Sequence, residues 1–499
     1  MENRNYNMEN QVRKVLAFDF GASGGRAMIC TFDGEKISMQ EIHRFTNDPV
    51  TVQGTMYWDV LRLYHEIKQG LIKSKEYGGA ESVAVDTWGV DFCLIGKDGR
   101  MLENPIHYRD ARTAGMVERS AKYLNPDELY DITGNQMMEI NTFYQLLSLR
   151  EQRPDLLERA DALLLMPDLF HYLLSGKKCA ELSIASTTQM MDARKKAWSG
   201  RVLDAIGVKT SLLPPIVPTG TVLGPISADL REELGLPEMQ VIAAAGHDTQ
   251  CAIAAVPAAE ENFIFLSCGT WSLLGTELEA PLIDANSRRL DVTNECGFAG
   301  KTSFLKNIIG LWLIQESRRQ WMRENQTYSF GELEEMAEKC TPFASLIDPD
   351  DPVFTPSGDI PERIREYCRK TGQHVPQSPG EIVRCINESL AFKYRHAVEE
   401  ISACTGKQYP AFYMIGGGTK SAQLCTFTAN ACGCRVIAGP AEATVLGNAA
   451  IQLCALGAIS GLGEIRKIVR ASEPVQTYEP SDTERWDAAY ARFKEVTGC

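Results

Sequence analysis

One local pattern occurs twice in this sequence, and it limits the folds that the chain can adopt. An apolar strand at residues 15–20 leads into a glycine-rich turn at 21–26 and a second apolar strand at 27–32. Residues 262–275 repeat the order of strand, small-residue turn and strand, with Gly269 in the turn. Because each turn leads into a strand and not into a helix, neither the Walker nor the Rossmann pattern applies. The repeat predicts an α/β chain with two similar units that hold phosphate groups between paired hairpins.

Length and charge exclude several classes of protein. At 499 residues the chain is too long for a single core, so two or more domains are expected. The net charge of −14 argues against nucleic acid as a partner, since the field repels phosphate backbones. No apolar run reaches the roughly 20 residues that a membrane-spanning helix needs. The polar residues 1–14 lack the apolar core of a secretion signal. We expect a cytoplasmic protein without a membrane partner, as a monomer or a small homo-oligomer.

The cysteines indicate reduced thiols. Their number, 15, is odd, and most lie in apolar or helical contexts such as Cys251, Cys385 and Cys454. No CxxC pair has zinc-like partners, and Cys432 and Cys434 are separated by a single residue. We expect buried, reduced cysteines and no structural zinc site.

A strand, a tight turn and a helix are predicted to follow one another at residues 241–257. Residues 241–245 are apolar, Gly246 breaks the run, and a small-residue apolar segment follows Asp248. A carboxylate at this place lies at the positive end of a helix and at the carboxyl end of a strand, where open α/β sheets bind their ligands. Asp248 is therefore a candidate site residue. The alternative is that it only caps the helix.

Asp19 interrupts the first apolar strand just before the glycine-rich turn. A buried acid without a partner is costly, so this position suggests that Asp19 binds a metal ion or serves a phosphate group. The alternative is an aspartate of the core whose hydrogen bonds are satisfied within the protein.

Residues 82–92 predict an apolar strand that becomes polar at Asp86 and Asp91. Trp88 lies beside Gly89 and Asp91, which places an aromatic face next to an acceptor for hydroxyl groups. This combination suits a sugar-binding platform, with Asp91 accepting hydrogen bonds from the sugar. The alternative is that Trp88 belongs to the core, as most tryptophans in strands do.

Several motifs together resemble the FGGY family of carbohydrate kinases, from about residue 15 to about residue 469. The glycine-rich motifs are shared with the wider actin-like ATPase fold: DFGASGGR (19–26), GTWSLLG (269–275), GGG (416–418) and GPAEATVLGN (439–448). Others are typical of family members that act on L-rhamnulose: EIHRF (41–45), DTWGVDF (86–92), YRDART (108–113) and KNIIGLWLIQ (306–315). The motif GHDT (246–249) surrounds Asp248.

The resemblance implies a fold of two RNase H-like α/β domains with a deep cleft between them. The N-terminal domain, residues 1–242, would bind the sugar, and the C-terminal domain, residues 243–499, would bind ATP. Two positions depart from the family pattern, because a serine is expected where Gly24 stands and another where Cys268 stands. Both replacements are small, so only the finer phosphate geometry is affected.

The resemblance also implies roles for individual residues. Asp248 would be the base that accepts the proton of the sugar hydroxyl, and Asp19 and Asp248 would hold Mg²⁺, usually through water. The sugar contacts, to which the platform argument adds Asp91, would be Gly89, His247, Asp248, Thr249 and Asn307. The ATP contacts would be Ala22, Ser23, Gly24, Gly25, Arg26, Thr270, Gln315 and Gly417.

The implied activity is ATP-dependent phosphorylation of L-rhamnulose to L-rhamnulose 1-phosphate, in L-rhamnose catabolism. An aspartate with an ordinary pKa of about 3.9 suffices as the base, because a loose transition state leaves the proton on the nucleophile until late. Trp88 and Phe92 are candidate walls for the methyl group of this sugar. Two alternatives stay open: a kinase for another ketose such as L-fuculose or L-xylulose, and a non-catalytic sugar or nucleotide sensor on the same fold. A sensor could lose Asp248 without harm, so its presence favours an enzyme.

Overall fold

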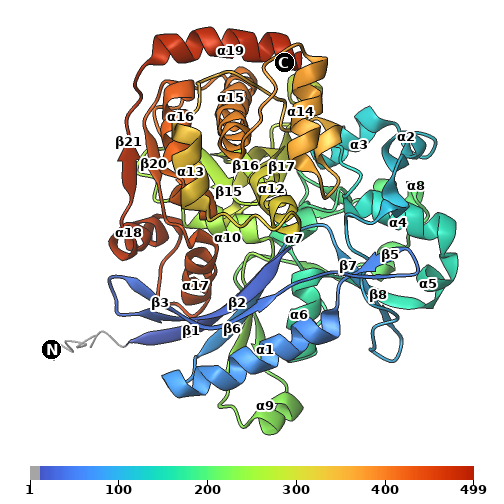
Figure 1. The fold of residues 1–499 in the computed structure, drawn as a ribbon. Coiled ribbons are helices and arrows are strands. Elements are labelled where there is room, and N and C mark those ends of the chain that lie inside the picture. Colours follow the sequence, from blue (N-terminus) through green and yellow to red (C-terminus); the bar gives the residue numbers. More distant parts are fainter. Residues whose placement is uncertain (1–11) are drawn as a thin grey trace. The chain divides into compact units, whose positions relative to one another are not determined.

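The computed structural model describes residues 12–499, whose helices and strands form two compact units (Figure 1). The first unit contains residues 12–255, with Leu278–Ser303 and Ala443–Glu473. The second contains Val256–Glu277, Phe304–Glu442 and Pro474–Cys499. Each unit is therefore assembled from separated segments, whereas the resemblance suggested two continuous domains, 1–242 and 243–499.

The sheet of the first unit has the strand order β13-β14-β6-β1-β2-β3. Its strands are β1 (Arg13–Gly21), β2 (Gly24–Phe32), β3 (Ile37–Thr46), β6 (Ser82–Thr87), β13 (Thr221–Pro225) and β14 (Gln240–Ala243). β1 and β2 form the predicted hairpin, in which Gly21 pairs with Gly24. β6 runs parallel to both β1 and β14. The register of β1 and β6 sets Asp19 beside Asp86.

Helix α1 (Val60–Ser74) confirms the helical spacing of the sequence. The side chain of Asp59 caps it by accepting a hydrogen bond from the backbone N–H of Arg62. Leu63, Ile67 and Leu71 recur every four residues, so they lie on one face of the helix, and all three are buried. They belong to the apolar core that also contains the inward side chains of the sheet.

Helices α10 (Asp248–Ala254) and α17 (Ala443–Ala455) pack closely against each other within the first unit. A Cβ atom at Gly447 of α17 would lie 1.8 Å from the carbonyl oxygen of Cys251 in α10, so only glycine permits this approach. α17 also packs on β1 and β6, and α18 (Leu462–Ser472) packs on β3. The segment Ala443–Glu473, from the last part of the sequence, therefore completes the first unit (Figure 1).

The predicted strand at 82–92 is shorter than expected. β6 ends at Thr87, and the chain turns at Val90, whose φ of 66° lies in the left-handed region. A new strand, β7 (Phe92–Gly96), then pairs with β8 (Ala160–Leu165). Because of this turn, Trp88 and Phe92 lie in two different apolar clusters of the first unit.

Further helices and strands complete the first unit. Its helices include α3 (Pro126–Thr133), α4 (Thr142–Gln152), α6 (Met166–Ser175), α7 (Leu182–Ser186), α8 (Gly200–Ala205) and α9 (Ala228–Leu234). Strand β17 (Thr293–Cys296) comes from the inserted segment Leu278–Ser303. It packs against α7.

In the second unit the strands follow the order β18-β16-β15-β19-β20-β21. These are β15 (Ile264–Cys268), β16 (Trp271–Leu278), β18 (Thr302–Ile309), β19 (Phe412–Ile415), β20 (Val436–Ala438) and β21 (Gln476–Tyr478). β15 and β16 are antiparallel, which confirms the second predicted hairpin. The helices include α12 (Trp312–Arg323), α13 (Phe330–Glu338), α14 (Ile360–Lys370), α15 (Pro379–Thr405), α16 (Ala422–Cys432) and α19 (Thr483–Thr497).

Two expectations from composition concern the whole chain. Within residues 12–499 no helix has the length and apolar character that crossing a membrane requires. Residues 1–11, on which most of the secretion argument depends, lie outside the described residues. Most cysteines are buried, and no disulfide joins any of them in the described part of the chain.

Candidate active site

Asp248 is the first residue of α10, directly after the turn that follows β14. The turn is fixed by its backbone: Gly246 donates its N–H to Glu181 Oε2 at 2.8 Å and accepts from the N–H of Thr87 at 2.9 Å. Asp248 Oδ1 accepts from the backbone N–H of Thr249 at 2.5 Å, and the side chain keeps 29% of its exposure. The predicted strand, turn and helix are confirmed. They place the carboxylate just beyond the carboxyl end of β14.

The pKa of Asp248 is not that of an ordinary aspartate. Burial raises its pKa to about 6, the positive charge of His247 lowers it, and the negative charge of Asp19 raises it further. The expectation of an ordinary value near 3.9 therefore needs correction. A carboxylate with a pKa of about 6 is a stronger base than a free aspartate and is still mostly ionised at neutral pH.

Two ionisable residues lie opposite Asp19 on its neighbouring strands: Arg26 on β2 and Asp86 on β6. Asp19 is also close enough to Asp248 for its charge to act on that residue. Asp19 Oδ2 accepts hydrogen bonds from Arg26 Nη2 at 2.7 Å and Nε at 3.0 Å. Asp86 is fully buried; its Oδ2 accepts from Asn448 Nδ2 at 2.6 Å, and its Oδ1 meets no hydrogen-bond donor within residues 12–499. Burial and then the charge of Asp19 raise the pKa of Asp86 well above its usual range, which favours the neutral acid.

The predicted metal residues fit a loosely held Mg²⁺. In the described part of the chain, no three His, Cys, Asp or Glu side chains converge to form a metal site. Asp19 and Asp248 nevertheless supply the carboxylate oxygens that Mg²⁺ prefers, and each adds negative charge to the surroundings of Asp86. Mg²⁺ usually keeps several waters and uses one or two carboxylates together with substrate phosphates. These two acids therefore suit the ion, whereas a complete protein cage is not present among the described residues.

The first hairpin turns at Ala22 and Ser23, between Gly21 and Gly24. Asn47 braces this turn, because its backbone N–H donates to Ser23 O at 3.2 Å and its Nδ2 donates to Gly21 O at 3.0 Å. Gly25 is required by packing, since a Cβ there would lie 2.4 Å from the ring of Phe45. Of the residues predicted to contact ATP, Arg26 holds Asp19 through its guanidinium group.

Gly89 lies in front of the His247 ring. A Cβ at Gly89 would lie 3.5 Å from Thr187 Oγ1 and 3.6 Å from His247 Nε2. Thr87, two residues earlier, pairs with His247 in an isolated parallel bridge. The structure therefore brings the predicted sugar residues Gly89, His247 and Asp248 together within the first unit.

Asp91 does not fit the predicted contact with a sugar. It is only 1% exposed, and Oδ2 accepts from the indole Nε1 atoms of Trp58 and Trp88 at 2.6 and 3.0 Å. Oδ2 also accepts from the N–H of Tyr108 at 3.2 Å, and Oδ1 accepts from Gln145 Nε2 at 2.9 Å. Because protein donors occupy both oxygens, Asp91 organises the wall behind Gly89 and does not reach a ligand.

Trp88 belongs to the same buried wall. It is 6% exposed, and its ring lies 3.9 Å from that of Trp58, which in turn stacks on His107 at 4.1 Å. The core interpretation of Trp88 therefore describes it better than an open aromatic platform.

The second unit carries the other predicted contacts. Thr270 Oγ1 donates to Gln315 Oε1 at 3.2 Å, and the N–H groups of Gly310 and Trp312 donate to Thr270 O. Gly417 follows Gly416 at the end of β19, where the chain turns with φ 83° at Gly416. Asn307, predicted to contact the sugar, is half-buried on β18.

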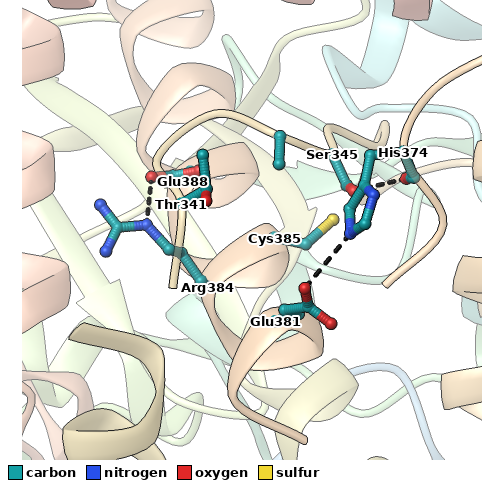
Figure 2. A pocket seen from close by; sticks show the side chains of 8 residues that line it. Thr341, Ser345, His374, Glu381, Arg384, Cys385 and Glu388 are labelled. Carbon is teal, nitrogen blue, oxygen red and sulfur yellow. Dashed lines mark hydrogen bonds and ion pairs between the residues drawn. The ribbon is translucent and has the colours of Figure 1, made fainter. Parts of the chain in front are cut away.

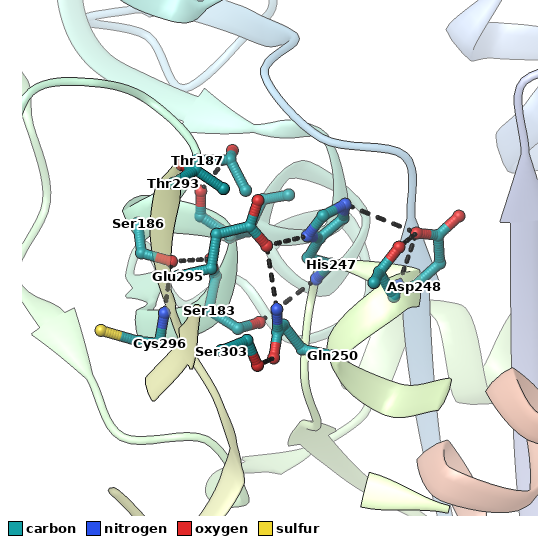
Figure 3. A network of polar contacts seen from close by, with 12 residues as sticks. Ser183, Ser186, Thr187, His247, Asp248, Gln250, Thr293, Glu295, Cys296 and Ser303 are labelled. Atoms are coloured by element: carbon teal, nitrogen blue, oxygen red, sulfur yellow. Dashed lines mark hydrogen bonds and ion pairs between the residues drawn. The ribbon is translucent and has the colours of Figure 1, made fainter. Parts of the chain in front are cut away.

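Sequence reasoning missed Glu295 and Gln250, which lie behind His247 (Figure 3). Glu295 Oε2 lies 2.9 Å from His247 Nδ1 and accepts from Gln250 Nε2 at 2.9 Å. Burial alone would lower the pKa of His247, but the charge and hydrogen bond of Glu295 raise it to about 9. Glu295 is 48 residues away from His247 in a short strand, and no local pattern signals this contact.

A separate cavity of about 310 Å³ lies within the second unit (Figure 2). Its lining residues are Thr341, Ala344, Ser345, His374, Glu381, Arg384, Cys385 and Glu388. The charged groups pair with one another: Arg384 Nε donates to Glu388 Oε1 at 2.8 Å, and His374 Nε2 lies 3.2 Å from Glu381 Oε1. None of the predicted sugar or ATP contacts lines this cavity, so we do not assign it to the reaction.

Comparisons with known proteins identify the family and the fold. Residues 14–255 match the N-terminal domain of the FGGY family of carbohydrate kinases, and residues 264–456 match its C-terminal domain. The chain is 42% identical to a rhamnulokinase of Bacteroides thetaiotaomicron over 97% of this chain and 99% of that protein. It is 38% identical to a rhamnulokinase of Oceanobacillus iheyensis over 93% and 97% of the two chains. A solved xylulose kinase from Lactobacillus acidophilus shares the fold, with a TM-score of 0.81 at 17% identity over 97% of both chains.

Proposed function

The chain belongs to the FGGY family of carbohydrate kinases and is a sugar kinase, and we propose that it phosphorylates L-rhamnulose on the 1-hydroxyl with ATP. The observation that carries the reaction is the carboxylate of Asp248 at the head of α10, next to His247 and Gly89. The curated relatives named rhamnulokinase, which match nearly the whole chain at 35–42% identity, support the choice of sugar.

In this proposal Asp248 accepts the proton of the sugar hydroxyl. As the hydroxyl oxygen bonds to the γ-phosphorus, the bond from that phosphorus to the β,γ-bridging oxygen breaks, and the proton passes to Asp248 late in the step. His247 and Thr249 flank the base, and Gly89 lies close to His247 Nε2, where a sugar hydroxyl would be bound. Asp91 contributes indirectly, by fixing the wall that contains Trp88.

Within the first unit, backbone N–H groups around Ala22 and Ser23 are the proposed phosphate contacts. Within the second unit, Thr270, Gln315 and Gly417 are the proposed ATP contacts. Asp19 and Asp248 would hold Mg²⁺, which when bound neutralises the charge of the transferring phosphoryl group. The ion pair and hydrogen bonds of Arg26 restrict the orientation of the Asp19 carboxylate.

A coupled assay of ADP release across a panel of ketoses tests the proposal. L-Rhamnulose should give the highest kcat/KM, and ³¹P NMR should show phosphate on the 1-position of the product. Faster turnover of L-fuculose or L-xylulose would keep the kinase and overturn the proposed sugar. Sugar binding without ADP release would favour the sensor. The variant Asp248→Asn serves as the inactive control.

A further inference from the structure

One carboxylate in contact with His247 has no part in the proposed reaction. Glu295 lies on β17, is 5% exposed, and directs Oε2 at the imidazole of His247 (Figure 3). The distance from Oε2 to His247 Nδ1 is 2.9 Å. The segment that carries Glu295, Leu278–Ser303, folds with the first unit. It lies within the part of the sequence that matches the family's C-terminal domain.

The contact fixes the orientation of the ring. With Nδ1 held by Glu295, Nε2 points to the other side, 3.6 Å from Asp248 Oδ1 and close to Gly89, where a Cβ would lie 3.6 Å from it. A ring rotated by half a turn would present carbon atoms to Glu295 and to Asp248, and it would lose both polar contacts. Only one orientation of His247 therefore serves the base and the proposed sugar at the same time.

Glu295 is itself held in place. Gln250 Nε2 donates to the same Oε2 at 2.9 Å, and Ser303 Oγ donates to Gln250 Oε1 at 2.8 Å. The chain of contacts runs from Ser303 through Gln250 and Glu295 to His247, and all four side chains are buried. Such a connected polar network restricts the position of each member.

We propose that Glu295 is a positioning residue of the sugar site: by holding Nδ1 of His247, it turns Nε2 to the sugar hydroxyl that Asp248 deprotonates. This inference rests on the proposed function, because it concerns how the same site orients its substrate. The competing explanation is that Glu295 only ties the inserted segment to α10.

The first test compares three variants by steady-state kinetics. Glu295→Leu removes the acceptor and should lower kcat/KM for the sugar by about 10- to 100-fold, the loss typical when the partner that orients a functional histidine is removed from a metal site. KM for ATP should stay unchanged. Glu295→Gln keeps an acceptor oxygen and should retain activity within about threefold of wild type. The matched control is Glu279→Gln, which changes an exposed carboxylate of the same segment that pairs with Lys301.

The second test is a double-mutant cycle with His247→Ala. If Glu295 acts through the ring, Glu295→Leu should have almost no further effect on kcat/KM once His247 is removed. Equal losses of Glu295→Leu in both backgrounds would overturn the inference, as would wild-type kcat/KM in Glu295→Leu.

A third measurement does not depend on turnover. In protein labelled with ¹⁵N-histidine, a hydrogen-bonded Nδ1–H resonance should be present in the wild type and in Glu279→Gln, and absent from Glu295→Leu and His247→Ala. Persistence of that resonance in Glu295→Leu would also overturn the inference. A wild type that phosphorylates no ketose but shows the resonance would overturn the proposed function and leave the contact established.

Discussion

Asp248 and Asp91 are two aspartates of the first unit with similar pKa values and different surroundings. Burial raises the pKa of each to about 6. Asp91 is enclosed by two indole N–H groups, a backbone N–H and the amide of Gln145. The side chain of Asp248 is 29% exposed. Within residues 12–499 its contacts with donors involve Oδ1: the N–H and hydroxyl of Thr249 and, at 3.6 Å, His247 Nε2.

The comparison separates two consequences of burying an acid. A raised pKa alone does not identify a catalytic base, because both side chains have it. The two side chains differ in how many of their carboxylate oxygens accept hydrogen bonds from protein donors. Both oxygens of Asp91 accept hydrogen bonds from protein donors, whereas Oδ2 of Asp248 is the atom proposed to accept the proton of the sugar hydroxyl.

The largest effect is expected from Asp248→Asn. Removing a positioned base typically costs 10²- to 10⁴-fold in rate, so kcat should fall by about that factor. Calorimetric titration should show near wild-type affinities for ketose and ATP, because the amide keeps the size of the side chain. A folded variant with wild-type turnover would contradict the assignment.

Asp91→Ala should affect stability more than chemistry. The change leaves the indole N–H groups of Trp58 and Trp88 and the backbone N–H of Tyr108 buried without their acceptor. Each such loss costs about 1–3 kcal/mol, so the free energy of unfolding should fall by roughly 3 kcal/mol or more. Urea titration measures it, and an unchanged midpoint would show that Asp91 does not hold the wall.

The pH dependence of activity should follow Asp248. Its pKa of about 6 means that the base is protonated below this pH. Accordingly, kcat/KM for the sugar should decrease about tenfold per pH unit on the acid side. Rates measured between pH 4.5 and 8 check this limb, and Asp91→Asn should leave its position unchanged. A limb centred near pH 4 would indicate an aspartate that burial does not perturb.

The contribution of Asp91 to stability should decrease as the pH rises, whereas the contribution of an ion-paired acid increases with pH. Its pKa in the folded state, about 6, lies above the ordinary value of about 3.9. The contribution of Asp91 is therefore fully present below about pH 4 and is lost as the pH rises through 6. Urea unfolding of wild type and Asp91→Asn at pH 5 and pH 7.5 should show a difference that changes between the two conditions. A constant difference would contradict it.

The smallest effect is expected from Asp19→Asn, which should change the pKa of Asp248 but not that of Asp91. The charge of Asp19 raises the pKa of Asp248, so its removal should move the acid limb to lower pH by less than about one unit. The half-saturating Mg²⁺ concentration should increase, because one carboxylate ligand is weakened. An unchanged Mg²⁺ titration would remove Asp19 from the metal site.

The sequence predicted much of the scaffold, because local patterns determine it. The glycine turns predicted both hairpins, and the break at Gly246 predicted the start of α10. The early end of β6 was not predicted, because the left-handed conformation at Val90 has no glycine or asparagine to signal it.

The site was predicted only in part, since some of its contacts depend on tertiary structure. Asp86 was visible as an acid in an apolar strand, but its place beside Asp19 follows from strand register. The role of Asp91 was misjudged, because its donors Trp58 and Gln145 lie 33 and 54 residues away in the sequence. Glu295 was not predicted because it lies 48 residues from His247 in the sequence.

The close approach of α10 and α17 at Gly447 has a consequence for synthesis on the ribosome. Gln452 of α17 donates to the carbonyl oxygen of Leu16 at 3.1 Å and accepts from Ser82 Oγ at 2.7 Å. β1 and β6 therefore gain these contacts with α17 only after more than 350 further residues have been translated. At 5–20 residues per second, this delay lasts roughly 20–90 s. Gene fragments that stop after Ala255 contain all six strands of the sheet of the first unit but lack α17, so they should expose the face of β1 and β6 that this helix covers. A chimaera of two relatives should exchange residues 443–473 together with the N-terminal segment.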